Sequence, residues 1–248
     1  MQLRDFFKRN QRIAVAFSGG VDSSYLLFAA KAAGCDVRAY FIKSQFQPTV
    51  ELNEAIRHAA RIGAPLTVDA INVLDDPEVT KNPPDRCYYC KTMMLKRLKE
   101  LAQADGFDVL CDGTNADDDE SDRPGMRALR EQGVESPLSD AGLTKEAIRH
   151  LSKEAGLPTH DKPSYACLAT RIPEGTPLTV RLIGKIEKAE EALYDMGFSD
   201  LRVRLIPPRG ALIQLPDDQW DTAAANRAEI LAVLHLYFDR VMLDLITR

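Results

Sequence analysis

One stretch near the start of the sequence limits the fold more than any other. Residues 15–27 read VAFSGGVDSSYLL, an apolar run followed by two glycines and then by apolar residues at helical spacing. This order predicts a buried strand, a tight loop and the first turns of a helix. A second apolar run follows at 36–42, after Gly34, so the segment has the pattern of a β-α-β unit.

The alternation of strands and helices continues along the chain. The apolar periodicity predicts further helices near 49–62, 88–104 and 145–156, and further strands at 66–71 and 107–113. Strands that alternate with helices imply a parallel sheet with helices on both faces, so the expected fold class is α/β. Residues 117–143 show only weak periodicity, and we interpret them as a loop at the edge of the active site.

A proline-rich stretch separates a second, smaller domain. Residues 157–179 contain four prolines and no sustained period, which predicts a domain junction near residue 170. The chain beyond it predicts a helix, two strands, a long helix and a last strand, at 179–196, 201–206, 211–215, 217–235 and 238–245. We therefore expect two domains, 1–170 and 171–248, the second of them a small α/β domain.

Composition narrows the class of protein. The 248 residues are 45% hydrophobic, enough to bury a core in one or two domains. The sequence has neither an early apolar run flanked by basic residues nor an unbroken apolar run of about 18 residues, so we expect a cytoplasmic protein without a membrane segment. The net charge of −5 makes a long nucleic acid an unexpected partner.

The glycine loop has the chemistry of an anion site. Backbone N–H groups of such a turn approach an anion closely, and the dipole of the following helix points at the same place. The residues of the expected cradle are Ser18, Gly19, Gly20, Ser23 and Ser24. A Walker A loop has a lysine before its hydroxyl residue, whereas this loop has Asp22, which argues against hydrolysis at the γ-phosphate.

The stretch SGGVDS at 18–23 resembles the signature of the PP-loop ATP pyrophosphatases. The resemblance implies a Rossmann-like PP-loop domain that binds ATP and Mg²⁺, adenylates a substrate oxygen at the α-phosphate and releases pyrophosphate. It places Asp22 at the pyrophosphate and Mg²⁺, and Gly113 in the nucleotide site. Ammonia, amines and sulfur are the nucleophiles that then displace AMP in such enzymes. A glycine turn with an ordinary Asp/Ser helix cap is the alternative, but it leaves the six-residue match unexplained.

The cysteines favour sulfur as that nucleophile. Cys87 and Cys90 form a C-x-x-C pair that suits one metal centre or a redox couple, and Cys167 is a third candidate. A structural zinc site needs four closed ligands, so we favour a [4Fe–4S] cluster, whose fourth iron stays open to bind sulfide. Cys35 and Cys111 are expected in the core.

At this point the sequence resembles the LarE-type sulfurtransferases, which put sulfur on pyridinium-3,5-biscarboxylate mononucleotide. The matching stretches are AFSGGVDSS at the loop, DGTN (112–115), DRPG (122–125), KPSYACLATRIPEGTPLT (162–179) and LRVR (201–204). One branch of that family sacrifices a single cysteine, and another holds a [4Fe–4S] cluster with three. Cys87, Cys90 and Cys167 match the second branch, and the sacrificial cysteine aligns best with Ala166.

The resemblance also implies the residues that hold the substrate. Arg202 and Arg204 alternate along a predicted strand, so both point to one face, where a guanidinium pair suits a phosphate. The other implied substrate residues are Thr170, Arg171, Asp119 and Arg123. Glu190 matches an acidic residue near a metal, although its charged helix equally fits a solvent-exposed position. Gln214 stands where an acid is expected.

Several other functions fit part of this pattern. A tRNA thiolation enzyme shares the loop and the cysteines, and sulfur taken from Cys167 itself is another route. An ammonia-using amidotransferase leaves the cysteines without a role, and a nucleotide sensor binds without turnover. The interpretation that we favour implies as partners a small nucleotide substrate, sulfide or another sulfur donor, and further copies of the chain in a homo-oligomer, of which a hexamer is one form.

Overall fold

The computed structural model describes residues 2–118 and 124–246, which divide into two compact units. The first unit comprises Met1–Val73 and Asp85–Tyr165, and the second comprises Leu74–Pro84 and Ala166–Arg248. The change from one unit to the other therefore follows Tyr165, whereas the sequence predicts the junction near residue 170. Leu74–Pro84 belongs with the second unit because its backbone pairs there: the carbonyl of Thr80 accepts from the Leu178 N–H at 2.8 Å.

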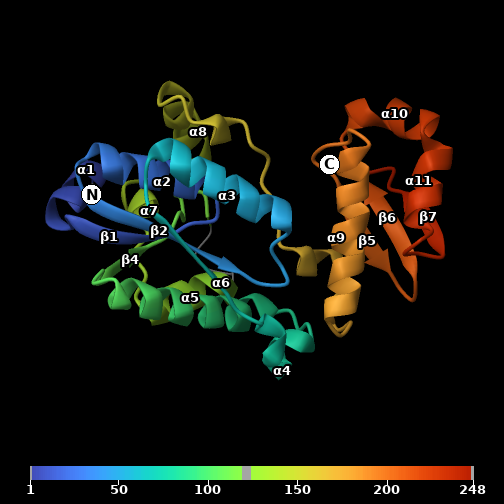
Figure 1. The fold of residues 1–248 in the computed structure, drawn as a ribbon, viewed down its shortest axis with the longest axis horizontal. Helices are drawn as coiled ribbons and strands as arrows, with labels where there is room; N and C mark the ends of the chain where they lie inside the picture. The colour runs from blue at the N-terminus through green and yellow to red at the C-terminus, as the bar shows by residue number, and fades with distance from the viewer. Residues whose placement is uncertain (1, 119–123, 247–248) are drawn as a thin grey trace. The chain divides into compact units, whose positions relative to one another are not determined.

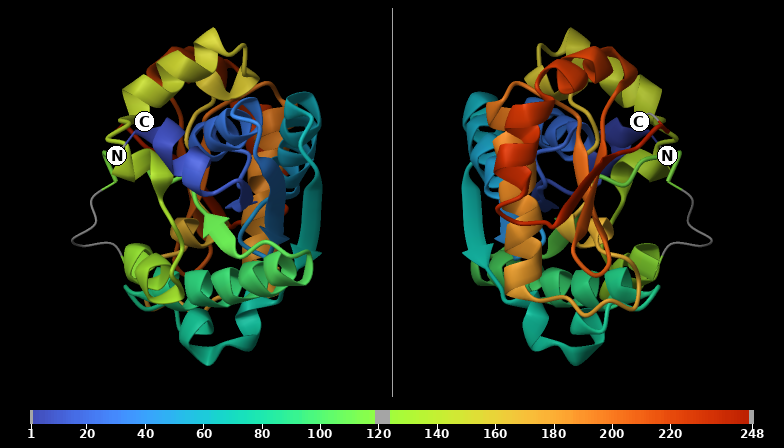
Figure 2. Two further views of the ribbon diagram at one scale, coloured as in Figure 1. Left: turned by 90° about the vertical axis from the view of Figure 1, so that its left-hand side faces the viewer. Right: turned by 90° about the vertical axis from the view of Figure 1, so that its right-hand side faces the viewer.

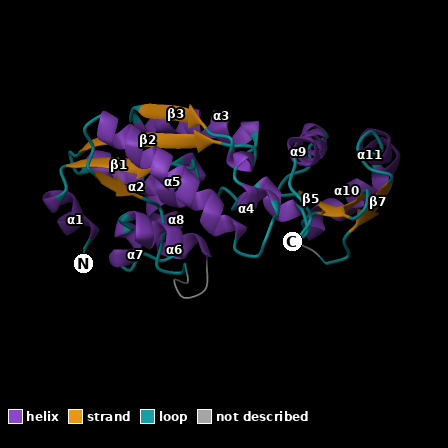
Figure 3. Ribbon diagram, turned by 90° about the horizontal axis from the view of Figure 1, so that it is seen from below, coloured by secondary structure: helices purple, strands orange, loops and turns teal. Residues whose placement is uncertain are grey.

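The first unit is built on a four-stranded sheet in the order β3-β2-β1-β4, and all the neighbouring pairs are parallel. The strands are β1 (Arg12–Ala16), β2 (Asp36–Lys43), β3 (Leu66–Ala70) and β4 (Val109–Cys111). Figure 3 shows the order β3, β2, β1 across the sheet. The α/β class with a parallel sheet, which the sequence predicts, is confirmed.

Helices cover both faces of this sheet (Figure 1). They are α1 (Leu3–Arg9), α2 (Val21–Ala32), α3 (Thr49–Ile62), α5 (Arg86–Ala104), α6 (Pro124–Gln132), α7 (Pro137–Asp140) and α8 (Lys145–Glu154). The short helix α4 (Pro77–Thr80) belongs to the second unit. Successive residues of β1 face opposite ways, so Ile13 and Val15 pack with α2 and α3, while Ala14 packs with α5 and α6. Each face therefore has its own hydrophobic core.

The interpretation of 117–143 as a loop is wrong for part of its length. Two helices, α6 and α7, lie within this segment, and α6 buries Met126, Ala128 and Leu129 against the sheet. The helix is short and opens on Pro124 and Gly125, which is why its period is hard to see. Residues 119–123 lie outside the described residues.

The second unit combines one long helix with a small mixed sheet. The strands are β5 (Arg202–Ile206), β6 (Gly210–Gln214) and β7 (Arg240–Leu243), with β5 antiparallel and β7 parallel to β6. Helix α9 (Val180–Asp195), orange in the right-hand view of Figure 2, lies beside the strands of this sheet. The helix contacts β5 and buries Ile183, Ile186 and Leu193. A small C-terminal α/β unit is thus confirmed.

The long helix predicted at 217–235 is wrong. The segment instead contains a 3-10 turn, η4 (Asp217–Gln219), and two short helices, α10 (Trp220–Ala225) and α11 (Arg227–Leu234). The break falls at Asn226, whose side-chain amide donates to the Thr222 carbonyl at 2.9 Å and so ends α10. Within residues 2–118 and 124–246, no helix is both long enough and apolar enough to cross a membrane.

Candidate functional site

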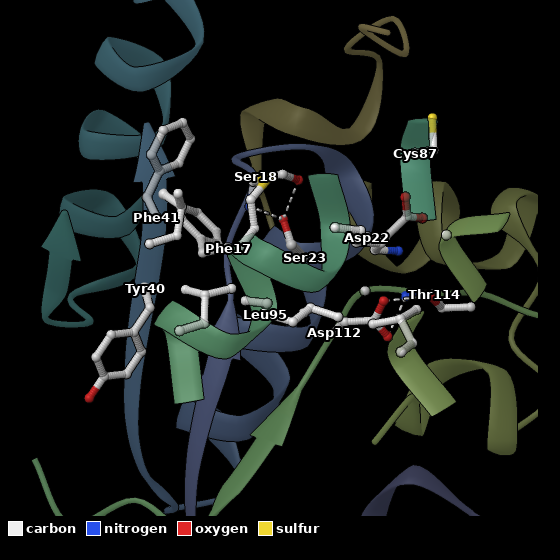
Figure 4. Close-up of a pocket in the computed structure, with 18 of the residues that line it drawn as sticks. Phe17, Ser18, Asp22, Ser23, Tyr40, Phe41, Cys87, Leu95, Asp112 and Thr114 are labelled. Atoms are coloured by element: carbon white, nitrogen blue, oxygen red, sulfur yellow. Dashed lines mark hydrogen bonds between the residues drawn. The ribbon is translucent and has the colours of Figure 1, made fainter. Parts of the chain in front are cut away.

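The glycine loop joins the carboxyl end of β1 to the first turn of α2, and two serines fix its shape (Figure 4). The Ser23 hydroxyl lies 3.1 Å from the Ser18 hydroxyl and accepts from the Ser18 N–H at 3.3 Å. The Gly20 N–H donates to Ser18 Oγ at 3.3 Å. The hydroxyls therefore tie the loop to the helix that follows it.

Two glycines allow other elements to approach this loop. Gly19 has φ +72°, and a Cβ there would lie 3.0 Å from Ala55 of α3. Gly113, just after β4, would place a Cβ 2.8 Å from the backbone nitrogen of Ser23. Both positions require glycine because the neighbouring atoms include backbone, which cannot move aside cheaply.

Next to Gly113, Asp112 braces the strand ends. Its carboxylate accepts from the Thr114 hydroxyl at 2.6 Å, the Thr114 N–H at 3.2 Å and the Ser136 hydroxyl at 2.7 Å. These bonds link the end of β4 to the residue before α7. Asp112 thus fixes the end of β4, which lies against the first turn of α2 at Gly113.

The two carboxylate oxygens of Asp22, on the first turn of α2, have different surroundings. Oδ2 pairs with the Lys145 ammonium, while Oδ1 is buried and makes no hydrogen bond to any part of the chain that the structure describes. A buried carboxylate oxygen without a donor is costly, so this oxygen is suited to a cation. Lys145 is a site residue that sequence reasoning missed.

These groups border a cavity of about 600 Å³ within the first unit. Ser18, Asp22, Ser23 and Gly113 of the predicted nucleotide site line it, while Gly19 and Gly20 shape the loop beside it. The lining also includes Cys87 and Lys91, one turn apart on α5, and apolar residues at the ends of the strands; Figure 4 labels Cys87 among them. The volume is in the usual range for a small-molecule site.

The lining of this cavity is acidic. Among the described residues that line it, four carry carboxylates and one carries an ammonium group: Asp22, Glu51, Asp112 and Asp118 against Lys91. An anionic ligand therefore meets net repulsion from the side chains unless it brings its own cations.

The predicted cluster ligands divide between the two units. Cys87 is exposed and Cys90 is buried, at positions i and i+3 of α5, a spacing that puts both thiols on one side of the helix. Cys167 is half-buried and precedes the 3-10 turn η3 (Leu168–Arg171) of the second unit. No group of three metal-ligating side chains occurs within the described residues. The three-cysteine site therefore stays a prediction.

Cys35 and Cys111 are buried in the core, as predicted. Burial raises the pKa of both thiols, so neither is a ready thiolate at neutral pH. Their burial is consistent with a packing role.

Arg171 and Glu190 form a buried ion pair in the second unit, with exposed fractions of 1% and 2%. Arg171 Nε lies 2.9 Å from Glu190 Oε1, and Nη1 donates to the Ala166 carbonyl at 2.7 Å. Glu190 Oε1 also accepts from the Val203 N–H at 2.9 Å. The solvent-exposed alternative for Glu190 is therefore wrong, and the guanidinium of Arg171 holds the backbone beside Cys167.

The other predicted substrate residues of this unit lie along β5. Arg202 and Arg204 are half-buried and alternate with buried residues, so they share one face. Arg204 donates to the Gln214 side chain at 2.6 Å and to the Thr170 carbonyl at 2.8 Å. Gln214 in turn donates to Asp244 at 2.7 Å, which lowers the pKa of that carboxyl. Asp119 and Arg123 lie outside the described residues.

The first unit combines a parallel sheet with a serine- and glycine-rich loop at the start of a helix, and comparison with known proteins identifies it as a domain of the HUP type. Residues 11–74 match the family described as tRNA methyl transferase HUP domain. An uncharacterized protein of Synechocystis sp. is 36% identical over 218 residues, which are 88% of this chain and 81% of that protein.

Two relatives have named activities. The pyridinium-3,5-bisthiocarboxylic acid mononucleotide synthase of Lactiplantibacillus plantarum is 35% identical over 196 residues, 78% of this chain and 71% of that enzyme. The tRNA-specific 2-thiouridylase MnmA of Pseudothermotoga lettingae is 26% identical, over 66% of this chain and 57% of that enzyme. The chain belongs to the LarE-like family of PP-loop ATP-dependent sulfurtransferases.

Proposed function

We propose that this protein adenylates a carboxylate of pyridinium-3,5-biscarboxylate mononucleotide and then replaces AMP with sulfur. One observation carries the proposal: Cys87 lines the same cavity as the loop residues Ser18, Asp22 and Ser23. A nucleotide held by the loop thus has a thiol in its own cavity. The 35% identity to the bisthiocarboxylic acid mononucleotide synthase supports the choice of substrate.

The first step follows from the groups around the loop. The loop N–H groups and the dipole of α2 would hold the β- and γ-phosphates, and Asp22, whose Oδ1 makes no hydrogen bond within the described residues, would hold the Mg²⁺ that neutralises them. An oxygen of the substrate carboxylate attacks the α-phosphorus, and the bond to the bridging oxygen of pyrophosphate breaks. The products are an acyl-adenylate and pyrophosphate.

The second step exchanges AMP for sulfur. A sulfide adds to the activated carbonyl carbon and AMP leaves with the electron pair of the acyl–oxygen bond, which gives a thiocarboxylate after loss of a proton. Two cysteines one turn apart on α5 fit two ligands of an iron–sulfur cluster, and we infer that Cys87, Cys90 and Cys167 hold it. A [4Fe–4S] cluster, when bound, supplies an iron that is free to carry the sulfide.

The products of ATP cleavage test the adenylation step. Purified protein with ATP, Mg²⁺ and the pyridinium mononucleotide should release AMP and pyrophosphate, and it should release neither without the acceptor. ADP and phosphate as main products would contradict the proposal. Turnover with bulk tRNA in place of the mononucleotide would favour the tRNA thiolation function, which the 26% identity to a 2-thiouridylase keeps as the second candidate.

The sulfur source is tested separately, with protein purified without oxygen. Cys87→Ala, Cys90→Ala and Cys167→Ala should each lose the brown absorption, the EPR signal of the reduced protein and sulfur transfer, whereas the buried Cys35→Ala should keep most of all three. Intact-protein mass after several turnovers with sulfide should be unchanged. Conversion of Cys167 to dehydroalanine would show instead that the protein sacrifices its own cysteine.

Assembly is a separate proposal. We expect a homo-oligomer, as the resemblance implies, and light scattering on the purified protein measures its mass. A mass of one 27.6 kDa chain at all concentrations would refute it.

A further inference from the structure

The carbonyl of Gly19, at the centre of the glycine loop, is held by two side chains. Lys162 Nζ donates to it at 3.3 Å, and His58 Nδ1 lies 3.2 Å away. A carbonyl oxygen only accepts, so the proton of the neutral His58 ring is on Nδ1. Burial, reinforced by the Lys162 charge, lowers the pKa of His58 and keeps the ring neutral near pH 7.

Lys162 is itself fixed from two sides. Its ammonium lies 2.7 Å from Glu54 Oε2, and the exposed fractions of the two side chains are 17% and 29%. Its carbonyl accepts from Arg149 Nη2 at 2.8 Å. Glu54 and His58 lie one turn apart on α3, on either side of the contact between Ala55 and Gly19. We call Lys162, Glu54 and His58 the Gly19 clamp.

The Gly19 clamp determines which way a loop N–H points. The peptide bond between Gly19 and Gly20 is planar and trans, so its N–H points opposite to its C=O. Holding the Gly19 carbonyl toward α3 and Lys162 therefore turns the Gly20 N–H to the other side. On that side the N–H donates to Ser18 Oγ, and Ser18 lines the cavity. Loss of the clamp removes the contacts that hold this carbonyl, so the peptide can rotate and the Gly20 N–H loses its fixed direction.

Lys162 also lies close to Cys167 in the sequence. Lys162 precedes Cys167 by five residues, and Tyr165 is the last residue of the first unit. The segment that leads to Cys167 is therefore bound directly to the loop, not through a chain of intermediate packing contacts. A movement of the Gly19 peptide acts on that segment through one hydrogen bond.

We propose that Lys162 is a positioning residue: it orients the Gly19–Gly20 peptide toward the phosphates of the nucleotide and couples occupancy of the loop to the segment that carries Cys167. The coupling rests on the proposed function only in that Cys167 takes part in sulfur transfer. The partly exposed ion pair between Lys162 and Glu54 would by itself contribute little to stability, and the proposed effect is on the loop geometry.

Lys162→Met tests the proposal because it keeps the length of the side chain and removes its charge. Lys153→Met is the matched control, since Lys153 is exposed on α8. The probe is α,β-methylene-ATP with Mg²⁺, titrated by calorimetry into the full-length protein. Affinity should fall about tenfold in Lys162→Met, recover in Lys162→Arg and stay unchanged in Lys153→Met.

Hydrogen–deuterium exchange provides a second readout, which a purely structural role does not change. In the unsubstituted protein, saturating nucleotide should slow exchange in peptides that cover 163–171. Lys162→Met should lose this protection even when it is saturated with nucleotide, while exchange elsewhere around the loop still responds. If Lys162→Met does not fold, Glu54→Gln breaks the same ion pair from α3 and should reproduce the loss.

Three results would overturn the proposal: equal affinity of Lys162→Met and Lys153→Met, no nucleotide protection of 163–171 in the unsubstituted protein, or full protection in saturated Lys162→Met. These outcomes are separable from a failure of the proposed function. That failure is an absence of pyrophosphate formation by the unsubstituted protein, and the binding and exchange measurements do not depend on turnover.

Discussion

Gly113→Ala tests whether the end of β4 packs as closely against the glycine loop as the structure shows. The added Cβ would lie 2.8 Å from Ser23 N, 3.1 Å from Ser23 Cα and 3.2 Å from the carbonyl carbon of Asp22. All three are backbone atoms in the first turn of α2, so no side-chain rotation relieves the clash. Overpacking of this kind costs about 1–3 kcal/mol of the free energy of unfolding.

The matched control is Gly184→Ala in the second unit. Gly184 lies within α9, and a Cβ built there would meet no other part of the described chain within 4 Å, apart from its own helix backbone. Alanine in place of glycine inside a helix adds about 0.5–1 kcal/mol of stability. The same chemical change should therefore have opposite signs at the two positions.

Two probes separate the units during urea unfolding, which is needed because a chain with two units need not unfold in one step. Trp220 is the only tryptophan and belongs to the second unit, so its fluorescence follows that unit. Far-UV circular dichroism follows both units. Gly113→Ala should lower the dichroism midpoint and weaken binding of α,β-methylene-ATP, whereas Gly184→Ala should raise the fluorescence midpoint. An unchanged midpoint and affinity in Gly113→Ala would refute the close packing.

Four further predictions follow from the two units. Asp22→Ala should abolish pyrophosphate formation and leave the visible spectrum unchanged, since we propose that Asp22 acts at the pyrophosphate and Mg²⁺ and not at the cluster; colour loss would contradict this. Arg202→Ala should weaken binding of the pyridinium mononucleotide roughly ten- to a hundredfold with little change for ATP, as separate titrations would show. Glu190→Gln removes one partner of a buried ion pair and should destabilise the second unit by about 3 kcal/mol. The exposed Glu191→Gln is the control and should cost less than about 0.5 kcal/mol, with both variants measured by Trp220 fluorescence. The pKa of His58 is lowered in the folded protein, so just below the ordinary value of about 6.5 the unfolded state binds more protons than the folded state. The free energy of unfolding of the first unit should therefore fall as the pH is lowered from 7.5 to 5.5, and it should fall less in His58→Gln.

The parts of the fold that the sequence predicted are those whose signals are local. The order of strand, loop and helix at 15–27 is set by apolar spacing and two glycines, and the parallel sheet follows from its repetition. Helix α6 was missed because a helix of nine residues that starts with proline and glycine shows too little period. The break at Asn226 was missed because asparagine is tolerated within helices and ends one only when its side chain bonds backward.

Site residues whose position depends on contacts between distant parts of the sequence could not be predicted from local patterns. Lys145 meets Asp22 across 123 positions of sequence, and no local pattern marks such a pair. The sequence contained one weak signal. Lys145 is the first residue of α8, where a positive charge interacts unfavourably with the helix dipole unless a carboxylate lies nearby. Glu190 had no such signal, because its burial is set by packing of α9 on β5 and its neighbour Glu191 is exposed.

The acidity of the cavity connects the site with its ligand. Four carboxylates and one ammonium line it among the described residues, although the proposed ligand is a polyphosphate. Asp112 already satisfies its oxygens with Thr114 and Ser136, and Asp22 uses one oxygen on Lys145. The net negative charge of this lining repels a bare nucleotide and attracts a divalent ion, so under the proposed function the loop N–H groups and a cation act together. Nucleotide affinity should therefore depend steeply on Mg²⁺, more steeply than for a loop whose own lysine neutralises the phosphates.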